Sequence, residues 1–127
     1  MTPTTLPLRM RRNDDPLRLR FNITDGGVPV DMSSGYSAKL QVRDHAGDTG
    51  TPAFEANSAS SSGTRIALSA GGFDLIIYRS SLSTSPVGSL PAESVELAYD
   101  ILITTPAGDT NAWYVGTFTL EQGVTIA

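Results

Sequence analysis

The chain contains no cysteine and only one histidine, His45. A disulfide framework and a thiolate metal site are therefore excluded, and a single imidazole rules out a multi-histidine metal site within one chain. No stretch approaches the roughly 20 apolar residues that a membrane-spanning helix needs. The opening MTPTTLPLRMRR has no apolar run and does not resemble a signal peptide. We therefore expect a protein that is synthesised in the cytoplasm and does not contact a membrane.

Charged residues make up only 17% of the chain, and the formal net charge is −4. An acidic protein is not steered as a whole towards nucleic acid, so we expect no specific nucleic-acid partner. Positive charge is nevertheless concentrated near the N-terminus, in a cluster of arginines. The cluster is either a local phosphate-binding site or a strand surface that faces solvent or a partner, and the second interpretation is favoured. Its members are Arg9, Arg11, Arg12, Arg18 and Arg20.

Side-chain types that carry catalysis are present but poorly placed for it. The segment RDHAGDTG holds Asp44, His45 and Asp48, whose spacing matches neither a calcium loop nor a zinc motif. Asp14 and Asp15 are neighbours, and neighbouring side chains of a strand point to opposite faces, so turn-capping is the favoured role. No GxSxG elbow surrounds any serine. We therefore predict a non-enzymatic protein with no catalytic residue, no metal site and no cofactor.

Short alternating segments dominate the rest of the sequence. In LRLRFNIT, apolar residues at every second position predict a strand that is buried on one face. Turn signals such as DGG and TPAGD separate the segments, and the prolines in residues 80–94 permit at most one helical turn there. The pattern is typical of an all-β, Ig-like antiparallel β-sandwich of about seven strands. The predicted strands are residues 17–24, 36–43, 64–70, 73–79, 95–104 and 112–121, with a short edge strand around Phe54.

A length of 127 residues suits a single domain with one hydrophobic core. Residues 1–12 contain Pro3, Pro7 and few apolar positions, which predicts an extended N-terminal arm or an edge strand. We expect such an arm to be disordered alone and ordered on a neighbouring subunit. Residues 13–127 then form a single Ig-like β-sandwich domain, whose predicted core includes Phe21, Leu40, Ile77, Ile101 and Phe118.

Aromatic residues in the last predicted strand provide candidate contact residues. Alternation along AWYVGTFTLE places Tyr114 on the face of Phe118 and Trp113 on the face of Val115. Gly116 within this strand indicates a bulge or a close approach of another backbone segment. An exposed Trp113 contacts a protein partner more often than a glycan. The predicted partner-binding residues are Arg9, Arg11, Arg12 and Trp113.

A sugar-binding platform is a second hypothesis for the aromatic residues. It requires exposed rings on one face with polar neighbours, and the best candidates are Trp113, Tyr78 and the loop of residues 44–48. Some of the aromatic residues must instead fill the core. The residues available for the platform are Trp113, Tyr114, Tyr99, Tyr78 and Tyr36.

The segment RRNDDPLRLRFNITDGGVPVDMSSGYSAKLQVRDHAGD resembles the N-terminal Ig-like domain of the baseplate upper proteins of tailed bacteriophages. Asn13 stands where that family has a turn glycine, and the sequence ends where a baseplate protein continues into a helical linker and further domains. The final strand is similar to the closing strand of small phage virion proteins. The residues that carry the resemblance are Asp25, Gly27, Pro29, Asp31 and Met32, and then Gly116, Phe118, Leu120, Gly123, Val124 and Thr125.

The resemblance implies a structural protein of a tailed-phage virion, assembled in the cytoplasm of the bacterial host. Such a protein is a small Ig-like interaction module of the tail or baseplate region. Its partners are expected to be other virion proteins, namely tail, baseplate or capsid subunits, with multiple copies in a symmetric assembly. Two alternatives stay open: decoration of the capsid surface or a place at the neck, and a carbohydrate-binding module for host-surface glycans.

Overall fold

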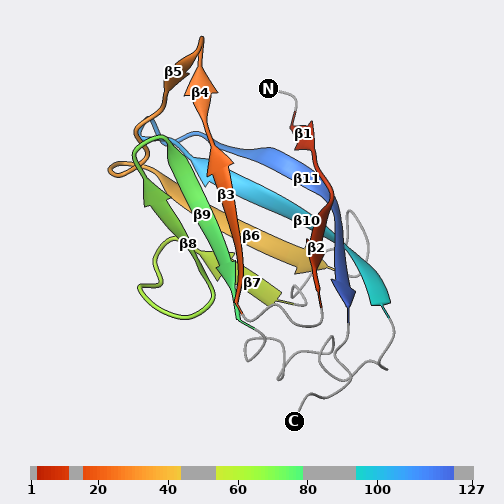
Figure 1. Ribbon diagram of the computed structural model, residues 1–127. Coiled ribbons are helices and arrows are strands. Elements are labelled where there is room, and N and C mark those ends of the chain that lie inside the picture. Colours follow the sequence, from red (N-terminus) through yellow and green to blue (C-terminus); the bar gives the residue numbers. More distant parts are fainter. Residues whose placement is uncertain (1–2, 12–15, 44–53, 79–93, 122–127) are drawn as a thin grey trace.

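The computed structural model describes residues 3–11, 16–43, 54–78 and 94–121. Two β-sheets pack face to face, which confirms the predicted all-β sandwich (Figure 1). Among these residues there is no helix, and hence none of the length and apolarity needed to cross a membrane. The first sheet contains β1 (Thr4–Thr5), β2 (Leu8–Met10), β6 (Ser37–Arg43), β7 (Phe54–Asn57), β10 (Ser94–Thr104) and β11 (Thr110–Glu121). The second contains β3 (Leu17–Asn22), β8 (Arg65–Ser69) and β9 (Gly72–Ile77), and a separate hairpin is formed by β4 (Thr24–Asp25) and β5 (Val28–Pro29).

The strand order is that of an immunoglobulin-like sandwich. The first sheet has the order β1-β11-β10-β6-β7, with β2 also paired to β11, and the second has the order β3-β9-β8. The seven principal strands are β3, β6, β7, β8, β9, β10 and β11. Taken in this order, they are divided between the two sheets in the same way as strands B, C, C′, D, E, F and G of an Ig domain. All pairs among these seven strands are antiparallel. The strands β3, β7 and β8 lie at the edges of their sheets.

Period-two alternation explains which faces of the sheets are buried. In β6, the side chains of Ala38, Leu40 and Val42 are buried, whereas the residues between them are exposed or half-buried. The burial predicted for the core is confirmed, because Phe21 is 6% exposed and the other four predicted residues are 0% exposed. These four are Leu40, Ile77, Ile101 and Phe118.

Glycine turns close the hairpins where the sequence predicts them. Gly26 and Gly27, with φ of 60° and 85°, connect β4 to β5, and Gly71, with φ of 89°, lies in the turn between β8 and β9. The Gly71 amide donates to the Val30 carbonyl at 2.8 Å, and the Ile23 amide donates to the Gly71 carbonyl at 2.9 Å. These bonds tie the base of the β4–β5 hairpin, which projects from the end of the sandwich in Figure 1, to the β8–β9 turn.

The N-terminal segment is part of the first sheet. Strands β1 and β2 pair in parallel with β11, with Thr4 opposite Tyr114 and Leu8 opposite Phe118. Leu8 and Met10 are 6% and 0% exposed and belong to the core. The edge strand, one of the two forms predicted for this segment, is therefore the form that the structure has. The expectation that few apolar positions leave the segment without anchors in its own core is wrong. Two apolar residues are enough to anchor the segment, because residues two apart in a strand point to the same face.

A close backbone approach at Gly116 holds this segment against β11. Gly116 has a φ of +153°, and a Cβ at this position would lie 2.6 Å from the carbonyl oxygen of Leu6. The same carbonyl accepts a hydrogen bond from the hydroxyl of Tyr99, which lies opposite Gly116 on β10. The Leu6 amide donates to the Val115 carbonyl at 2.9 Å. Of the two explanations for this glycine, the close approach is confirmed.

Gly116→Ala is expected to destabilise the protein more than Gly108→Ala does. Gly108 also has a positive φ of 94°, but no atom lies within 4 Å of the place that its Cβ would take, so its substitution costs only backbone strain, about 1–2 kcal/mol. At Gly116 the new methyl group must also displace the Leu6 backbone, which raises the expected loss to about 2–4 kcal/mol. Urea unfolding of both variants measures the difference. Equal losses would mean that the N-terminal segment moves aside without cost.

Candidate functional site

The residues predicted to bind a partner do not gather in one place. Arg9 on β2 and Arg11 just after it have exposed side chains near one end of β11. Trp113 lies towards the other end of β11 and is partly buried against the core. Arg12 lies outside the described residues, and so do the acidic turn and the polar cluster considered above: Asp14, Asp15, Asp44, His45 and Asp48.

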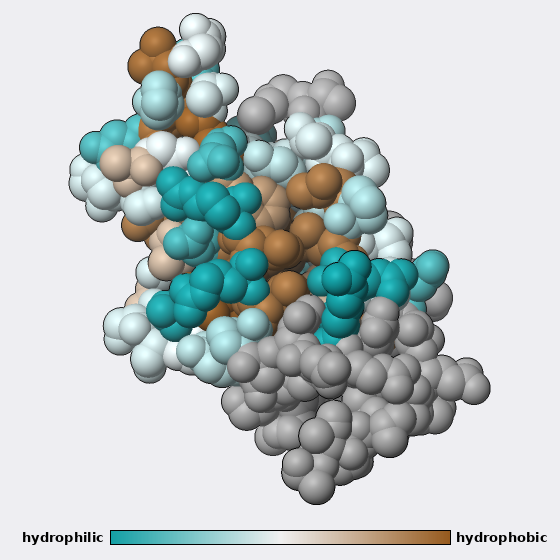
Figure 2. Space-filling view, viewed as in Figure 1, coloured by the Kyte–Doolittle hydropathy of each residue, from teal (hydrophilic) through white to brown (hydrophobic). Residues whose placement is uncertain are grey.

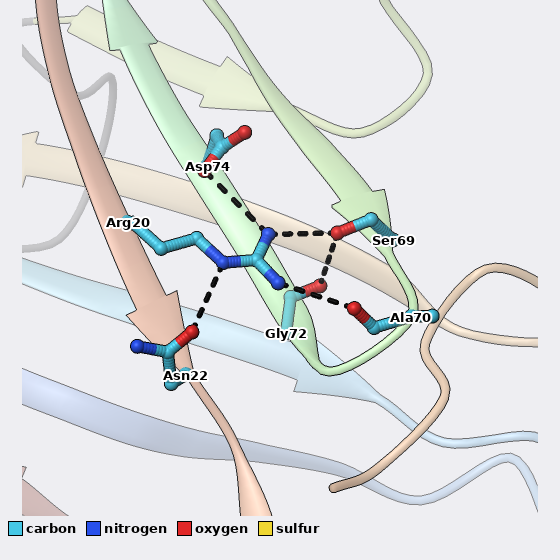
Figure 3. Close-up of polar contacts among 6 residues, drawn as sticks. All are labelled: Arg20, Asn22, Ser69, Ala70, Gly72 and Asp74. Carbon is cyan, nitrogen blue, oxygen red and sulfur yellow. Dashed lines mark hydrogen bonds and ion pairs between the residues drawn. The ribbon is translucent and has the colours of Figure 1, made fainter.

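Arg20 is a structural residue that bridges two strands and a turn. Its guanidinium donates to Ser69 Oγ at 2.7 Å and to the Ala70 carbonyl at 3.2 Å, while its Nε donates to Asn22 Oδ1 at 3.1 Å (Figure 3). Its Nη1 also lies 3.5 Å from a carboxylate oxygen of Asp74. Arg20 therefore ties β3 to the β8–β9 turn, and this member of the arginine cluster is engaged within the fold.

An apolar seam, the β2–β3 seam, lies where one edge of each sheet meets. It forms an open groove with a volume of about 250 Å³. Figure 2 shows apolar surface in the middle of this face of the molecule, flanked by strongly polar residues. Within the described part of the chain, β3 pairs only with β9, so one side of its backbone is open to a further strand. The residues that line the seam are Leu6, Pro7, Leu8, Arg9, Leu19, Arg20 and Phe21.

A second opening, the aromatic cavity, lies at the end of the sandwich that carries the β4–β5 hairpin. Its volume of about 510 Å³ falls within the range of roughly 300–1,000 Å³ that is typical of small-molecule sites. Its walls come from β1, from the end of β3 and the segment between β3 and β6, and from β11, which Figure 1 shows converging at this end. The lining residues are the aromatic Tyr36, Trp113 and Tyr114, the apolar Ile23 and Val30, and the polar Thr4, Asn22, Thr24 and Asp25.

A β-bulge brings Trp113 and Tyr114 to the same cavity. Ile101 on β10 lies opposite Tyr114, whereas Leu102 lies opposite Ala112, so Trp113 is the extra residue of the longer strand. Successive residues of a regular strand point to opposite faces, but a bulge re-aims one of them. The prediction that alternation separates Trp113 from Tyr114 is therefore wrong. Both side chains pack against the core and line the cavity.

Packing against core rings holds Tyr114 in place. Its ring lies edge-on to Phe21 and Phe73, with centroid distances of 4.9 Å and 6.3 Å. Burial raises the pKa of Tyr114 above the ordinary tyrosine value of 10.0, which is already far above neutral, so its hydroxyl is protonated at pH 7. Tyr114 therefore presents a fixed, neutral ring to the cavity.

Tyr36 reaches the cavity from the loop before β6. The preceding Gly35 has a φ of +80°, and a Cβ there would lie 2.9 Å from Pro106 Cγ in the β10–β11 turn. A residue with a side chain would not fit this close contact. Gly35 therefore lets the loop pack against the turn, which sets the position of Tyr36.

The remaining candidates for a sugar platform lie elsewhere. Tyr99 is 4% exposed, its hydroxyl is bound to the Leu6 carbonyl, and burial, followed by the nearby Tyr114, raises the pKa of Tyr99 to about 12. Tyr78 follows Ile77, at the opposite end of β9 from Gly72, and is not among the cavity residues. Of the aromatic residues considered for a platform, Trp113, Tyr114 and Tyr36 line the cavity, and the sequence did not place them beside its polar residues.

Asp100 carries a buried oxygen on the outer side of β10. Its Oδ1 has no hydrogen-bond partner among the described residues. Burial raises the pKa of Asp100, and the positive charge of Arg43 on β6 partly opposes this effect. Ionisation of Asp100 therefore lowers the free energy of unfolding of the protein.

Asp100→Asn is expected to stabilise the protein at about pH 7 and to have little effect below pH 3.8, the ordinary value for aspartate. Because the folded-state pKa is raised, protonated Asp100 contributes stability that is present below this value and lost as pH rises through the folded-state pKa. The asparagine amide does not ionise, so the variant does not lose this stability as pH rises. Urea unfolding across the acidic range tests this, with exposed Glu96→Gln on the same strand as the control. A variant that is less stable than wild type at neutral pH would contradict it.

Within the described ranges, no three histidine, aspartate or glutamate residues lie close enough to hold a metal ion. Among the described residues, the β2–β3 seam and the aromatic cavity are the surfaces from which we infer a function. No protein-family model matches the chain, and no curated protein matches it.

Proposed function

We propose that this protein is a non-enzymatic interaction module of a tailed-phage virion that binds neighbouring subunits in the tail or baseplate region. The β2–β3 seam is the observation that carries the proposal. The resemblance of the turn and strand motifs to baseplate upper proteins supports the virion setting. If multiple copies bind at once in a symmetric assembly, the overall attachment is strong even though each single contact is weak.

The seam has the composition of a protein-binding surface. Protein interfaces have an apolar centre and a polar rim, with arginine enriched among the residues that contribute most binding energy. In the seam, leucine and phenylalanine side chains line the opening, and Arg9 and Arg20 stand beside them. The open side of β3 offers backbone donors and acceptors to an added strand. The partner that fits is an extended segment of a neighbouring subunit, with apolar residues at alternate positions.

Composition of the virion tests the proposal. Purified virions of the phage or prophage that carries the gene are expected to contain the protein in a fixed ratio to the tail proteins, as measured by quantitative mass spectrometry. Immunogold labelling then locates it on the tail or baseplate. Label on the capsid or neck would instead assign the protein to one of those locations. Its presence in the lysate but absence from virions would refute the proposal.

A pair of matched variants tests the seam itself. Leu19 on β3 and Leu68 on β8 are both partly buried leucines on edge strands of the second sheet, but only Leu19 lines the seam. Leu19→Gln is expected to lower the copy number in virions, whereas Leu68→Gln leaves it unchanged. The melting temperature of each purified variant shows whether the two substitutions perturb the fold equally. Equal copy numbers for the two variants would exclude the seam as the attachment surface.

A further inference from the structure

We infer that the aromatic cavity is a binding site for an uncharged pyranose residue of a glycan. The inference rests on the cavity alone and does not depend on the role of the β2–β3 seam. Ligand sites combine aromatic walls with a few polar groups that fix orientation, and this cavity has both.

The aromatic wall suits the flat face of a sugar ring. Aromatic rings carry negative charge on their faces, so they attract the weakly positive C–H groups that a pyranose presents on one side. Trp113 and Tyr114 offer adjacent rings from the bulge, and Tyr36 offers a third from the loop before β6. Such rings bury a large area at a small entropic cost, because each side chain has only two rotatable angles.

The polar wall suits the hydroxyl groups at the edge of a sugar ring. The carboxylate of Asp25 is exposed, and the structure gives it no hydrogen bond or ion pair among the described residues. The Asn22 side chain lies on the exposed face of β3, where its Oδ1 accepts a bond from the Nε of Arg20, so we assign no ligand contact to its amide. Thr4 and Thr24 add hydroxyl groups that both donate and accept. Acceptors and donors are therefore both available to a ligand with several hydroxyls.

The charge of the lining excludes anionic ligands. Phosphates and carboxylates are recognised mainly by arginine and lysine, and neither residue type is among those that line the cavity. The carboxylate of Asp25, the only one among the described lining residues, repels an anion. A neutral sugar is therefore favoured over a nucleotide, a sulfated glycan or a sialylated one.

The bulge makes the site largely pre-formed. Bulges are common beside functional sites because they re-aim a single side chain. Tyr114 is fixed by the rings of Phe21 and Phe73, and the base of the hairpin beside the cavity is tied to the β8–β9 turn. A ligand that enters thus meets walls that are already positioned, which lowers the entropic cost of binding.

The chain contains a built-in probe of this site, because Trp113 is its only tryptophan. The experiment titrates the full-length protein with a panel of neutral oligosaccharides built from hexoses, N-acetylhexosamines and deoxyhexoses, and follows the emission of Trp113. We expect at least one neutral oligosaccharide to produce a saturable spectral change. Sulfated and sialylated oligosaccharides of matched size are expected to bind at least about tenfold more weakly.

Two variants that keep the fluorophore connect the signal to the cavity. Asp25→Ala and Tyr36→Ala are each expected to weaken binding about tenfold, since one removes a charged acceptor and the other a ring. Asp109→Ala and Tyr78→Ala are the matched controls, because both residues lie outside the cavity lining. Both controls are expected to bind as wild type does. Circular dichroism and melting temperature of each variant establish that it is folded.

Three results would overturn the inference. The first is the absence of a saturable change with every neutral oligosaccharide of the panel. The second is an equal loss of binding in the cavity variants and their controls. The third is a saturable change with a library of short peptides but with none of the sugars, which would assign the cavity to a protein partner.

Discussion

Phe118→Ala is expected to lower the free energy of unfolding by about 3–5 kcal/mol, which is a large share of the roughly 5–15 kcal/mol of a typical domain. Phe118 is 0% exposed and lies between Leu97 of β10 and Leu8 of β2 in the first sheet. Its removal creates a cavity at the point where three strands meet, and the surrounding backbone pairs prevent the space from collapsing. Urea unfolding followed by circular dichroism measures the loss.

The neighbouring Thr117→Ala is the control for this prediction. Thr117 is exposed on the same strand, so its substitution is expected to change the free energy of unfolding by no more than about 0.5 kcal/mol. The contrast between adjacent positions tests the assignment of the two faces of β11. Similar losses at both positions would mean that the face assignment of this strand is in error.

The fold could be predicted because its strands obey simple alternation. The segment YSAKLQVR places its apolar residues at every second position, and β6 buries Ala38, Leu40 and Val42 accordingly. The turns carried equally local signals, such as the two glycines between β4 and β5. Local signals of this kind depend on neighbouring residues only, so a single sequence reveals them.

The N-terminal strands were harder to predict, because their stability comes from distant partners. A three-residue strand with two apolar side chains has little periodicity of its own. What holds it in place is the glycine at position 116, more than 100 residues away, together with the hydroxyl of Tyr99. The sequence showed the glycine but not the segment that packs against it.

The aromatic cavity was missed because a bulge breaks the alternation on which the prediction relied. A signal for this bulge is nevertheless present in the sequence. If the hairpin is paired outward from Thr104 and Thr110 without interruption, Leu97 meets polar Thr117, and Phe118 falls on the opposite face. One extra residue in β11 restores the match between Leu97 and Phe118, which is the register that the structure has. The conflict shows that a bulge is needed, but the position of the bulge within the strand is set by tertiary packing.

Removal of residues 1–11 is expected to destabilise the protein severely and to cause self-association. The truncation deletes the buried side chains of Leu8 and Met10, each worth about 1.5–3 kcal/mol. It also removes the carbonyl that accepts the Tyr99 hydroxyl, which then stays buried without that partner. The uncovered edge of β11 offers its backbone to another copy of the chain. Urea unfolding and sedimentation velocity measure the two effects.

Removal of residues 1–3 is the control for this truncation, because it leaves both edge strands and the buried side chains in place. Met10→Ala in the full-length chain separates the two consequences, since it is expected to cost about 2–5 kcal/mol while the edge of β11 stays covered and the protein stays monomeric. A chain without residues 1–11 that unfolds at the wild-type urea concentration would restore the interpretation of this segment as a free arm. Partner binding would then be expected at the arginines of the arm, because the β2–β3 seam exists only while β2 is paired with β11.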